Sequence, residues 1–245
     1  MTVPPSVIWH DVECGSYDAD LSLWRALADG ARGPVLDVGA GTGRVSLDLA
    51  RRGHEVIALD ADPDLLHELA ARARAAALDV QAVCADARDF DLGRTVGMVI
   101  VPMQTLQLLG GPDGRAAFLR CAARHLEPGA LLAAALADAL DGQLDDPLEA
   151  APALPDIREV DGTVYASHPI GVRVEPEGVV IERIRETVAP DGTRHAEGDE
   201  IRLDATDADA VGAQAAALGF AVLEPLVVPA TEDYVGSEVV LLCRS

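Results

Sequence analysis

The sequence predicts an α/β fold, a doubly wound and mostly parallel sheet with helices on both faces. An apolar run beginning at Val35 stops at a glycine-rich turn and then opens a helical segment. Strand-like and helix-like segments alternate with short connections up to Asp138, which is typical of a parallel sheet. Beyond Asp138, strong turn signals separate strand-like runs, and this pattern predicts an antiparallel β insertion.

The expected elements follow in chain order. A helix is expected over residues 16–30, with Trp24 of its imperfect apolar stripe in the core. Residues 139–157, rich in Ala, Asp and Pro, predict a loop or a broken helix, and a helix over 204–218 ends at Gly219. The remaining predictions are strands over 35–38, 53–60, 79–86, 96–102, 130–138, 163–174, 178–188, 194–203, 220–228 and 238–243, and helices over 43–52, 63–77 and 112–125.

The glycine-rich turn carries the clearest functional signal. Gly39, Gly41 and Gly43 occupy every second position, and Asp37 stands two residues before the first of them. Without side chains, the main chain can turn tightly and approach a ligand. The dinucleotide fingerprint Gly-x-Gly-x-x-Gly places its third glycine one residue later. The spacing found here resembles motif I of the class I S-adenosylmethionine (SAM) dependent methyltransferases.

Two more acids end the strand-like runs that follow. Asp60 lies 21 residues after Gly39, where a carboxylate can accept hydrogen bonds from a ribose diol. Asp60 and Asp62 can also start the helix before Pro63, and both roles are compatible. Asp86 ends the third run; the resemblance implies that it faces the adenine amino group, and a solvated turn acid is the alternative.

The resemblance covers residues 29–138 and implies SAM as cofactor, with S-adenosylhomocysteine (SAH) as product. Asp37 would orient the turn and reach the methionine ammonium, directly or through water, or else cap the amides of the turn. Tyr17 would close over the methionine part of the cofactor. Gln104, just after the fourth strand, would bond cofactor or acceptor, or stabilise its own loop. The predicted cofactor-binding residues are Tyr17, Asp37, Gly39, Ala40, Gly41, Gly43, Asp60, Ala61, Asp86, Ala87 and Gln104.

The resemblance also implies a seven-stranded sheet in the order 3-2-1-4-5-7-6 and one domain over residues 1–245. Residues 1–30 would form an N-terminal lid and helix. Residues 31–138 and 204–245 would form the core. Residues 139–203 would form an antiparallel cap after strand five, at the carboxyl ends of the strands, where it walls the acceptor pocket.

Composition excludes several classes of protein. The formal net charge is -22, and neither lysine nor asparagine occurs. The missing lysine excludes a Walker P-loop and a Schiff base, and the acidic surface disfavours a nucleic-acid partner. No run suits a membrane span or a signal peptide. The scattered cysteines predict no metal site, suit a reducing cytoplasm, and place Cys84 and Cys243 in buried strands.

The general base is less clearly marked. His10, in Trp9-His10-Asp11 near the expected lid, is the first candidate, although an incidental role is the alternative. His168, in the meander, is the second if it faces the pocket.

The sequence therefore predicts an enzyme that transfers a methyl group from SAM to an oxygen or nitrogen of a small-molecule acceptor. One alternative is a SAM-binding fold with a non-methylating catalytic or ligand-binding role. A nicotinamide-dependent oxidoreductase is a further alternative, which the early third glycine and the expected antiparallel final pair disfavour. A homodimer is possible because exposed strand edges of the meander invite a second chain.

Overall fold

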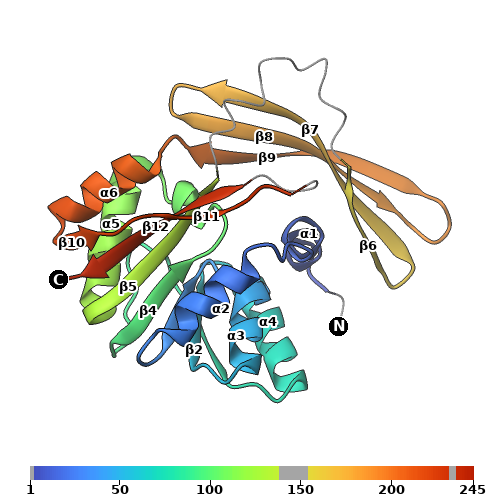
Figure 1. Ribbon diagram of the computed structural model, residues 1–245. Coiled ribbons are helices and arrows are strands. Elements are labelled where there is room, and N and C mark those ends of the chain that lie inside the picture. Colours follow the sequence, from blue (N-terminus) through green and yellow to red (C-terminus); the bar gives the residue numbers. More distant parts are fainter. Residues whose placement is uncertain (1–2, 138–153, 232–235) are drawn as a thin grey trace.

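The computed structural model describes residues 3–137, 154–231 and 236–245. Its strands form an eight-stranded mixed sheet and a separate four-stranded antiparallel sheet, the cap sheet (Figure 1). The helices are α1 (Pro5–Cys14), α2 (Leu21–Asp29), α3 (Arg44–Arg51), α4 (Pro63–Ala75), the 3-10 helix η1 (Thr105–Leu108), α5 (Gly111–His125) and α6 (Ala208–Ala217). The strands are β1 (Val35–Val38), β2 (Val56–Asp60), β3 (Val80–Cys84), β4 (Val96–Val101), β5 (Leu126–Ala137), β6 (Asp156–Val160), β7 (Thr163–Glu175), β8 (Gly178–Val188), β9 (Arg194–Asp204), β10 (Phe220–Val222), β11 (Leu226–Val228) and β12 (Ser237–Arg244).

The main sheet has the strand order β10-β12-β5-β4-β1-β2-β3, which confirms the predicted order. β1 pairs in parallel with β2 and β4, while β12 runs antiparallel to β5 and β10. The expected strand over 220–228 is divided into β10 and β11, which both pair with β12. Pro225 lies between them, and a proline cannot donate a hydrogen bond to a strand ladder. The sheet therefore has eight strands rather than the seven expected.

Helices cover both faces of the main sheet, as the alternation of elements predicts. Leu36 and Val38 of β1 belong to the apolar core beneath α5 and α6. Val35, on the opposite face of the same strand, packs with Trp24 of α2 and Val45 of α3. Trp24 is fully buried, so its predicted place in the core is confirmed. β3 lies at the end of the sheet, and for this reason Cys84 is exposed rather than buried, contrary to expectation.

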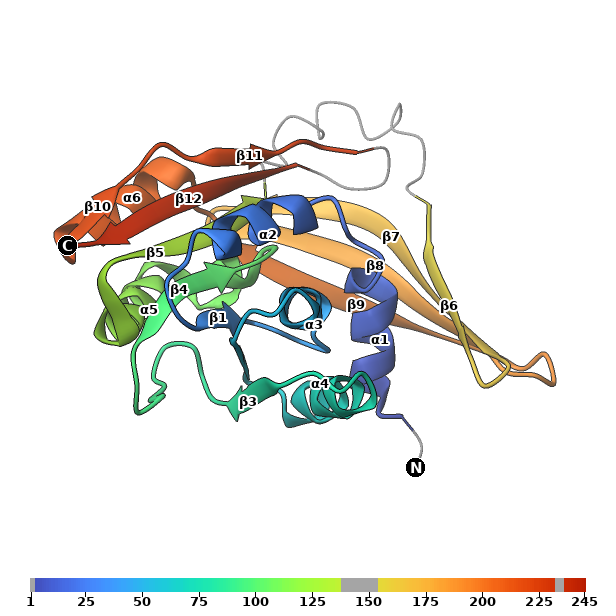
Figure 2. The ribbon, with the colours of Figure 1, turned by 60° about the horizontal axis from the view of Figure 1, so that its bottom comes forward.

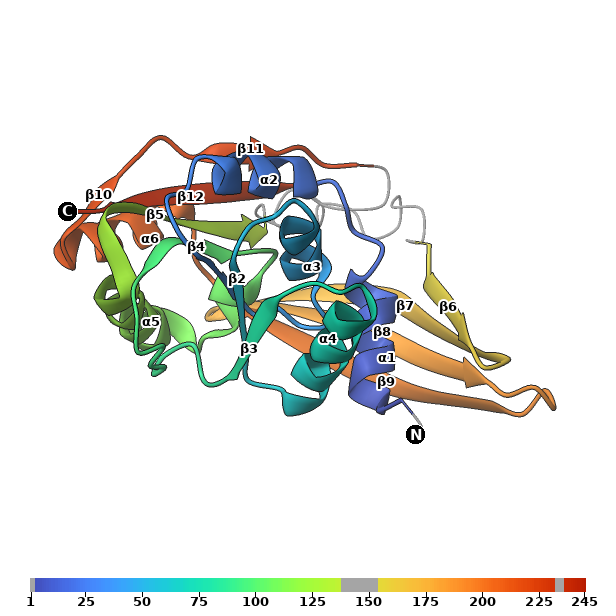
Figure 3. The ribbon, with the colours of Figure 1, turned by 90° about the horizontal axis from the view of Figure 1, so that it is seen from below.

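The N-terminal segment differs from the expected single helix over 16–30. α1 is an additional helix with proline in its first turn, a position that suits proline because its missing N–H is not needed there. α2 begins only at Leu21. Asp20 precedes it, accepts a hydrogen bond from the Trp24 indole and pairs with Arg44. Figures 2 and 3 show α1 between α4 and the cap sheet.

The cap sheet has the order β6-β7-β8-β9, so it contains one strand more than the three expected. The predicted loop or broken helix over 139–157 lies outside the described residues except for 154–157, where β6 begins. β7, β8 and β9 pair antiparallel through the two predicted turns. In the described parts of the chain, no helix is long and apolar enough to cross a membrane.

Candidate functional site

The glycine turn after β1 is fixed by the end of β2. The amides of Gly39 and Ala40 donate to the Leu59 carbonyl at 2.8 and 3.1 Å. The amide of Gly41 donates to Oδ2 of Asp60 at 2.8 Å. Gly41 has a φ of +56°, and a Cβ at this position would lie 2.1 Å from Nε2 of His10. The glycine therefore provides both a left-handed turn and the room that His10 occupies.

Three acids lie at or just beyond the carboxyl ends of β1, β2 and β3. Asp60 ends β2, and its Oδ1 accepts from the Asp62 amide at 2.9 Å. Asp62 caps α4 by accepting from the Asp64 amide, as predicted. Asp86 follows β3 and is held by a bidentate pair with Arg88, whose hydrogen bonds lower the Asp86 pKa to about 2. These parallel strands thus bring the three predicted acids to one edge of the sheet.

Asp37 is the most unusual of these acids. It is only 1% exposed, and burial raises its pKa to about 6. Its Oδ2 accepts a hydrogen bond from the Ser46 hydroxyl at 2.6 Å. Among the residues that the structure describes, none donates to its Oδ1. A buried carboxylate oxygen without a donor is costly, so this position is suited to a ligand that brings a cationic donor.

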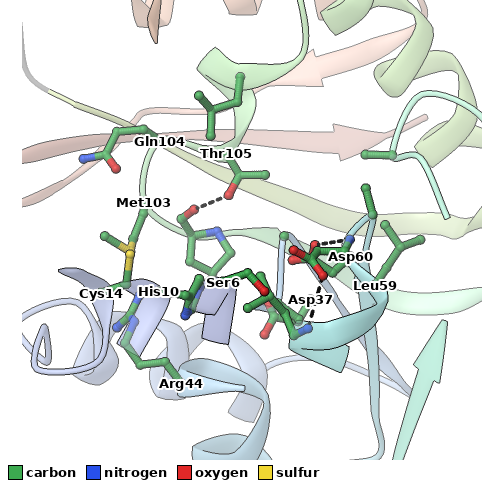
Figure 4. Close-up of a pocket in the computed structure, with 18 of the residues that line it drawn as sticks. Ser6, His10, Cys14, Asp37, Arg44, Leu59, Asp60, Met103, Gln104 and Thr105 are labelled. Carbon is green, nitrogen blue, oxygen red and sulfur yellow. Dashed lines mark hydrogen bonds between the residues drawn. The ribbon is translucent and has the colours of Figure 1, made fainter. Parts of the chain in front are cut away.

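A cavity of about 570 Å³ opens over these strand ends, and Figure 4 shows part of its wall. Its size is within the range of sites that hold a cofactor-sized molecule. Apolar residues of the lining include Val45, Leu59, Leu65, Leu108 and Leu109. The predicted site residues on this wall are His10, Asp37, Gly39, Ala40, Asp60, Ala61, Asp86, Ala87 and Gln104.

α1 covers one side of the cavity and contributes His10. The ring of His10 lines the cavity, and burial lowers its pKa, although Asp11 and Asp60 oppose the shift. Nδ1 lies 3.4 Å from the Thr42 hydroxyl, which itself donates to Oδ1 of Asp11 at 2.7 Å. Because the Thr42 proton points to Asp11, its oxygen is left to accept from Nδ1. Nε2 then carries the lone pair of a neutral ring.

The cap sheet and α1 form a second part of the wall. Glu13 is paired with Arg185 at 2.8 Å and with Arg183 at 2.8 Å, and it also accepts from the Ser167 hydroxyl. Arg185 stacks over the Trp9 ring at 5.3 Å. Trp9, Glu13, Arg185 and Ile201 all line the cavity. The cap therefore reaches the site through an ion-paired cluster rather than through an open loop.

The segment after β4 completes the wall. Met103 has a φ of +55°, which is uncommon for a residue other than glycine and is a form of backbone strain often found at functional sites. Thr105 donates to the Pro102 carbonyl at 3.1 Å. Its methyl group fills the space that a side chain on Gly39 would need, at 2.5 Å. Gln104 lies between Met103 and Thr105 on the wall.

The structure does not bring every predicted residue to this cavity. Gly41 is covered by His10, while Tyr17 and Gly43 line a second cavity of about 370 Å³. The ring of Tyr17 lies under the Arg44 guanidinium at 5.0 Å, so it reaches the first cavity only through Arg44. His168 stands opposite Ile184, on the face of the cap sheet away from that of the Ser167–Arg185 pair. It lies outside the cavity and faces Glu186 at 3.8 Å.

Several residues of the cavity wall are not among the site residues predicted from the sequence. The prolines at positions 4 and 5 could have signalled that α1 starts there, and α1 supplies Ser6, Glu13 and Cys14. Arg44 follows the last glycine of the turn and could have been noticed as the first residue of a helix. Arg185 and Ile201 carry no local signal, because only the packing of the cap sheet brings them here.

The predicted resemblance to the class I SAM-dependent methyltransferases is confirmed by a match to a methyltransferase family model and by solved structures that share this fold. Residues 35–129 match the family model of a methyltransferase domain. Over 95 residues the chain is 39% identical to the cypemycin N-terminal methyltransferase of a Streptomyces species, a match that covers 39% of this chain and 38% of that protein.

Three solved structures share the fold over nearly the whole chain. A SAM-dependent methyltransferase from Clostridium acetobutylicum superposes with a TM-score of 0.71 at 14% identity, covering 97% of this chain and 96% of that one. An amino pentose methyltransferase from Micromonospora echinaspora superposes with a TM-score of 0.70 at 19% identity, covering 100% of this chain and 99% of that one. A sugar N-methyltransferase from Streptoalloteichus gives 0.71 at 20% identity, with coverages of 97% and 91%.

Proposed function

We propose that this protein transfers a methyl group from SAM to an oxygen or nitrogen of a small-molecule acceptor. The observation that carries the proposal is the buried Oδ1 of Asp37, to which no described residue donates, in a cavity where the ends of three parallel strands each present an acid. Ligands of open α/β sheets bind at this edge. The amino-acid part of SAM carries an ammonium group, which supplies the cationic donor that Asp37 lacks.

The other acids fit the rest of the cofactor. Asp60 already accepts one backbone hydrogen bond on each oxygen, and each oxygen retains a lone pair for a ribose hydroxyl. Asp86 and Ala87 lie where the adenine would end, beside the apolar side chain of Leu109. When bound, SAM supplies a methyl group on a sulfonium that is open to in-line attack. The protein's task is then to align the acceptor with that methyl group and exclude water.

The acceptor would lie between the cofactor and the wall formed by α1, the segment after β4 and the cap sheet. Two structurally similar proteins are described as methyltransferases of an amino pentose and of a sugar nitrogen, and the relative in sequence as an N-terminal methyltransferase of cypemycin. These descriptions support a small acceptor and favour nitrogen. His10 is our candidate for the group that takes the acceptor proton, because Thr42 and Asp11 orient it with Nε2 unprotonated.

The alternatives make different predictions. A non-methylating SAM-binding protein would bind SAH without turnover of any acceptor. A nicotinamide oxidoreductase would bind NADH instead.

We further propose that the protein is cytoplasmic and has no nucleic-acid or membrane partner. We also propose a homodimer, since the cap sheet has two edge strands, β6 and β9, that a second chain could pair with.

The test is a calorimetric titration with SAH on wild type, Asp60→Asn and Asp64→Asn. Asp64 is an exposed acid in the first turn of α4 and serves as the control. We expect micromolar SAH binding, weakened at least about tenfold, or about 1.4 kcal/mol, by Asp60→Asn and unchanged by Asp64→Asn. Absence of SAH binding, or binding of NADH in its place, would contradict the proposal.

A further inference from the structure

The charges on the cavity wall bear on the kind of acceptor that it can hold. The described wall contains three arginines and five acids: Arg44, Arg88 and Arg185, and Glu13, Asp37, Asp60, Asp62 and Asp86. Each arginine is already held by a carboxylate in bidentate geometry, a strong and well-oriented interaction. Arg44 bonds Asp20, Arg88 bonds Asp86 and Arg185 bonds Glu13. No arginine of the described wall is left to receive an anionic group.

The acids of the wall are not all paired with cationic side chains. Asp60 and Asp62 accept only backbone hydrogen bonds, and one oxygen of Asp37 has no donor among the described residues. The described wall therefore carries more negative than positive charge. The net charge of -22 adds a long-range electrostatic field that attracts cations. SAM contributes one net positive charge when it binds. A carboxylate or phosphate acceptor would have to break an existing ion pair, which is costly for the partly buried pair of Glu13 and Arg185.

The proton acceptors of the wall narrow the choice further. An alcohol needs a base strong enough to assist removal of its proton during attack. Apart from the carboxylates, which are assigned above to the cofactor, to arginines or to a helix cap, the described wall offers the Nε2 atom of His10. Burial lowers the pKa of His10, so this nitrogen is a weak base. Burial raises the pKa of the Cys14 thiol to about 11, which keeps that group protonated near neutral pH. A neutral amine needs no such help, because its nitrogen already carries a lone pair.

From the charges and the proton acceptors of this wall, we infer that the acceptor is an amine, attracted as a cation and methylated on nitrogen. The inference rests on the proposed function. The bound ammonium first gives one proton to water, which frees the lone pair of the nitrogen. The amine nitrogen then donates this lone pair to the methyl carbon, the bond between that carbon and sulfur breaks, and the electron pair of that bond stays on sulfur in SAH. The nitrogen becomes an alkylammonium, which passes its proton to His10 or to water. The indole of Trp9 with Met103 and Ile201 would hold the body of the acceptor.

The first experiment compares three probes on one scaffold: benzylamine, benzyl alcohol and benzoate. Their affinities for the SAH-saturated full chain are measured by NMR titration at neutral pH and low salt, and methyl transfer is followed by mass spectrometry with trideuteromethyl SAM. We expect benzylamine to bind at least about tenfold more tightly than benzoate and to receive the label. Equal affinities, a preference for benzoate, or labelling of the alcohol or benzoate but not of the amine would overturn the inference.

A second experiment makes the wall more positive. Asp199 pairs with Arg185 at 2.8 Å but does not line the cavity, so Asp199→Asn should free part of that guanidinium. Glu200→Gln, on the same strand and 59% exposed, removes the same charge without touching an arginine of the wall. We expect the ratio of benzoate to benzylamine affinity to rise several-fold in Asp199→Asn alone. A similar rise in both variants, or in neither, would contradict the inference.

The two proposals fail separately. If SAH does not bind the wild-type chain, the methyltransferase proposal fails before any acceptor is tried. If SAH binds and the amine is not preferred, the proposed cofactor site stands and only the inference about the acceptor is lost.

Discussion

At the scale of single residues, Asp37 joins the fold to the proposed function. Asp37 belongs to a fully buried strand, and the lack of water there disfavours the ionised form of its carboxyl group. The first cause of its raised pKa is burial, and the nearby Asp60 adds to it, while Ser46 and Arg44 oppose it. A cofactor ammonium beside Oδ1 would favour the ionised form and reverse this shift.

The first prediction concerns pH. Because the pKa of Asp37 lies at about 6 without ligand, SAH binding below that pH must also remove a proton. The SAH association constant should therefore be constant above pH 7 and fall by about tenfold for each pH unit below 6. Calorimetry across this range measures the slope. The slope should persist in His10→Gln and disappear in Asp37→Asn; a wild-type affinity that does not change down to pH 4.5 would contradict the role of Asp37.

The second prediction concerns Gly41. Gly41→Ala should lower the free energy of unfolding in urea, because a left-handed φ costs about 1–2 kcal/mol and the new methyl group meets His10. Gly93→Ala is the control, since Gly93 has a φ of +63° and no atom near its missing Cβ. If His10→Ala is added to Gly41→Ala, the double variant should regain the part of the stability loss that exceeds the loss in Gly93→Ala. If both glycine variants lose the same stability, His10 does not pack on Gly41 as described.

At the scale of elements, α1 connects the core to the cap sheet. Asp11 bonds Thr42 of the glycine turn and pairs with Arg72 of α4 and Arg158 of β6. Glu13 pairs with two arginines of β8. The sequence predicts a lid in this region, but the charged residues of α1 do not reveal their partners, which lie up to 172 positions away.

The third prediction tests this connection. Glu13→Gln should reduce the free energy of unfolding by about 1–3 kcal/mol, because it removes the charge that Arg183 and Arg185 share in a partly buried place, where they keep only Asp199. Glu55→Gln is the control; Glu55 pairs with Arg94 but is 59% exposed, so its loss should cost about 1 kcal/mol or less. Urea unfolding followed by circular dichroism measures both. Equal, small losses would show that Glu13 does not fasten α1 to the cap sheet.

At the scale of the whole molecule, the predictable part of the fold is the part with local signals. The apolar runs that carry Asp37 and Asp60 predict parallel strands, since each leads into a helix, α3 or α4, that returns over the sheet. The order of the strands came from the family resemblance. The break between β10 and β11 has a local signal in Pro225, whereas the additional strand β6 depends on its pairing with β7. The part of the wall that the cap sheet contributes has no local signal either, because Arg185 and Glu13 come into contact only in the folded chain.

The most direct test of the central claim is a crystal structure of the full chain with SAH. We predict that the SAH ammonium lies within hydrogen-bonding distance of Oδ1 of Asp37, that the ribose hydroxyls contact Asp60, and that the adenine ends beside Asp86. Such a complex would place the sulfur toward Met103, Gln104 and the cap wall. SAH bound in the second cavity beside Tyr17, or with its ammonium away from Asp37, would contradict the account.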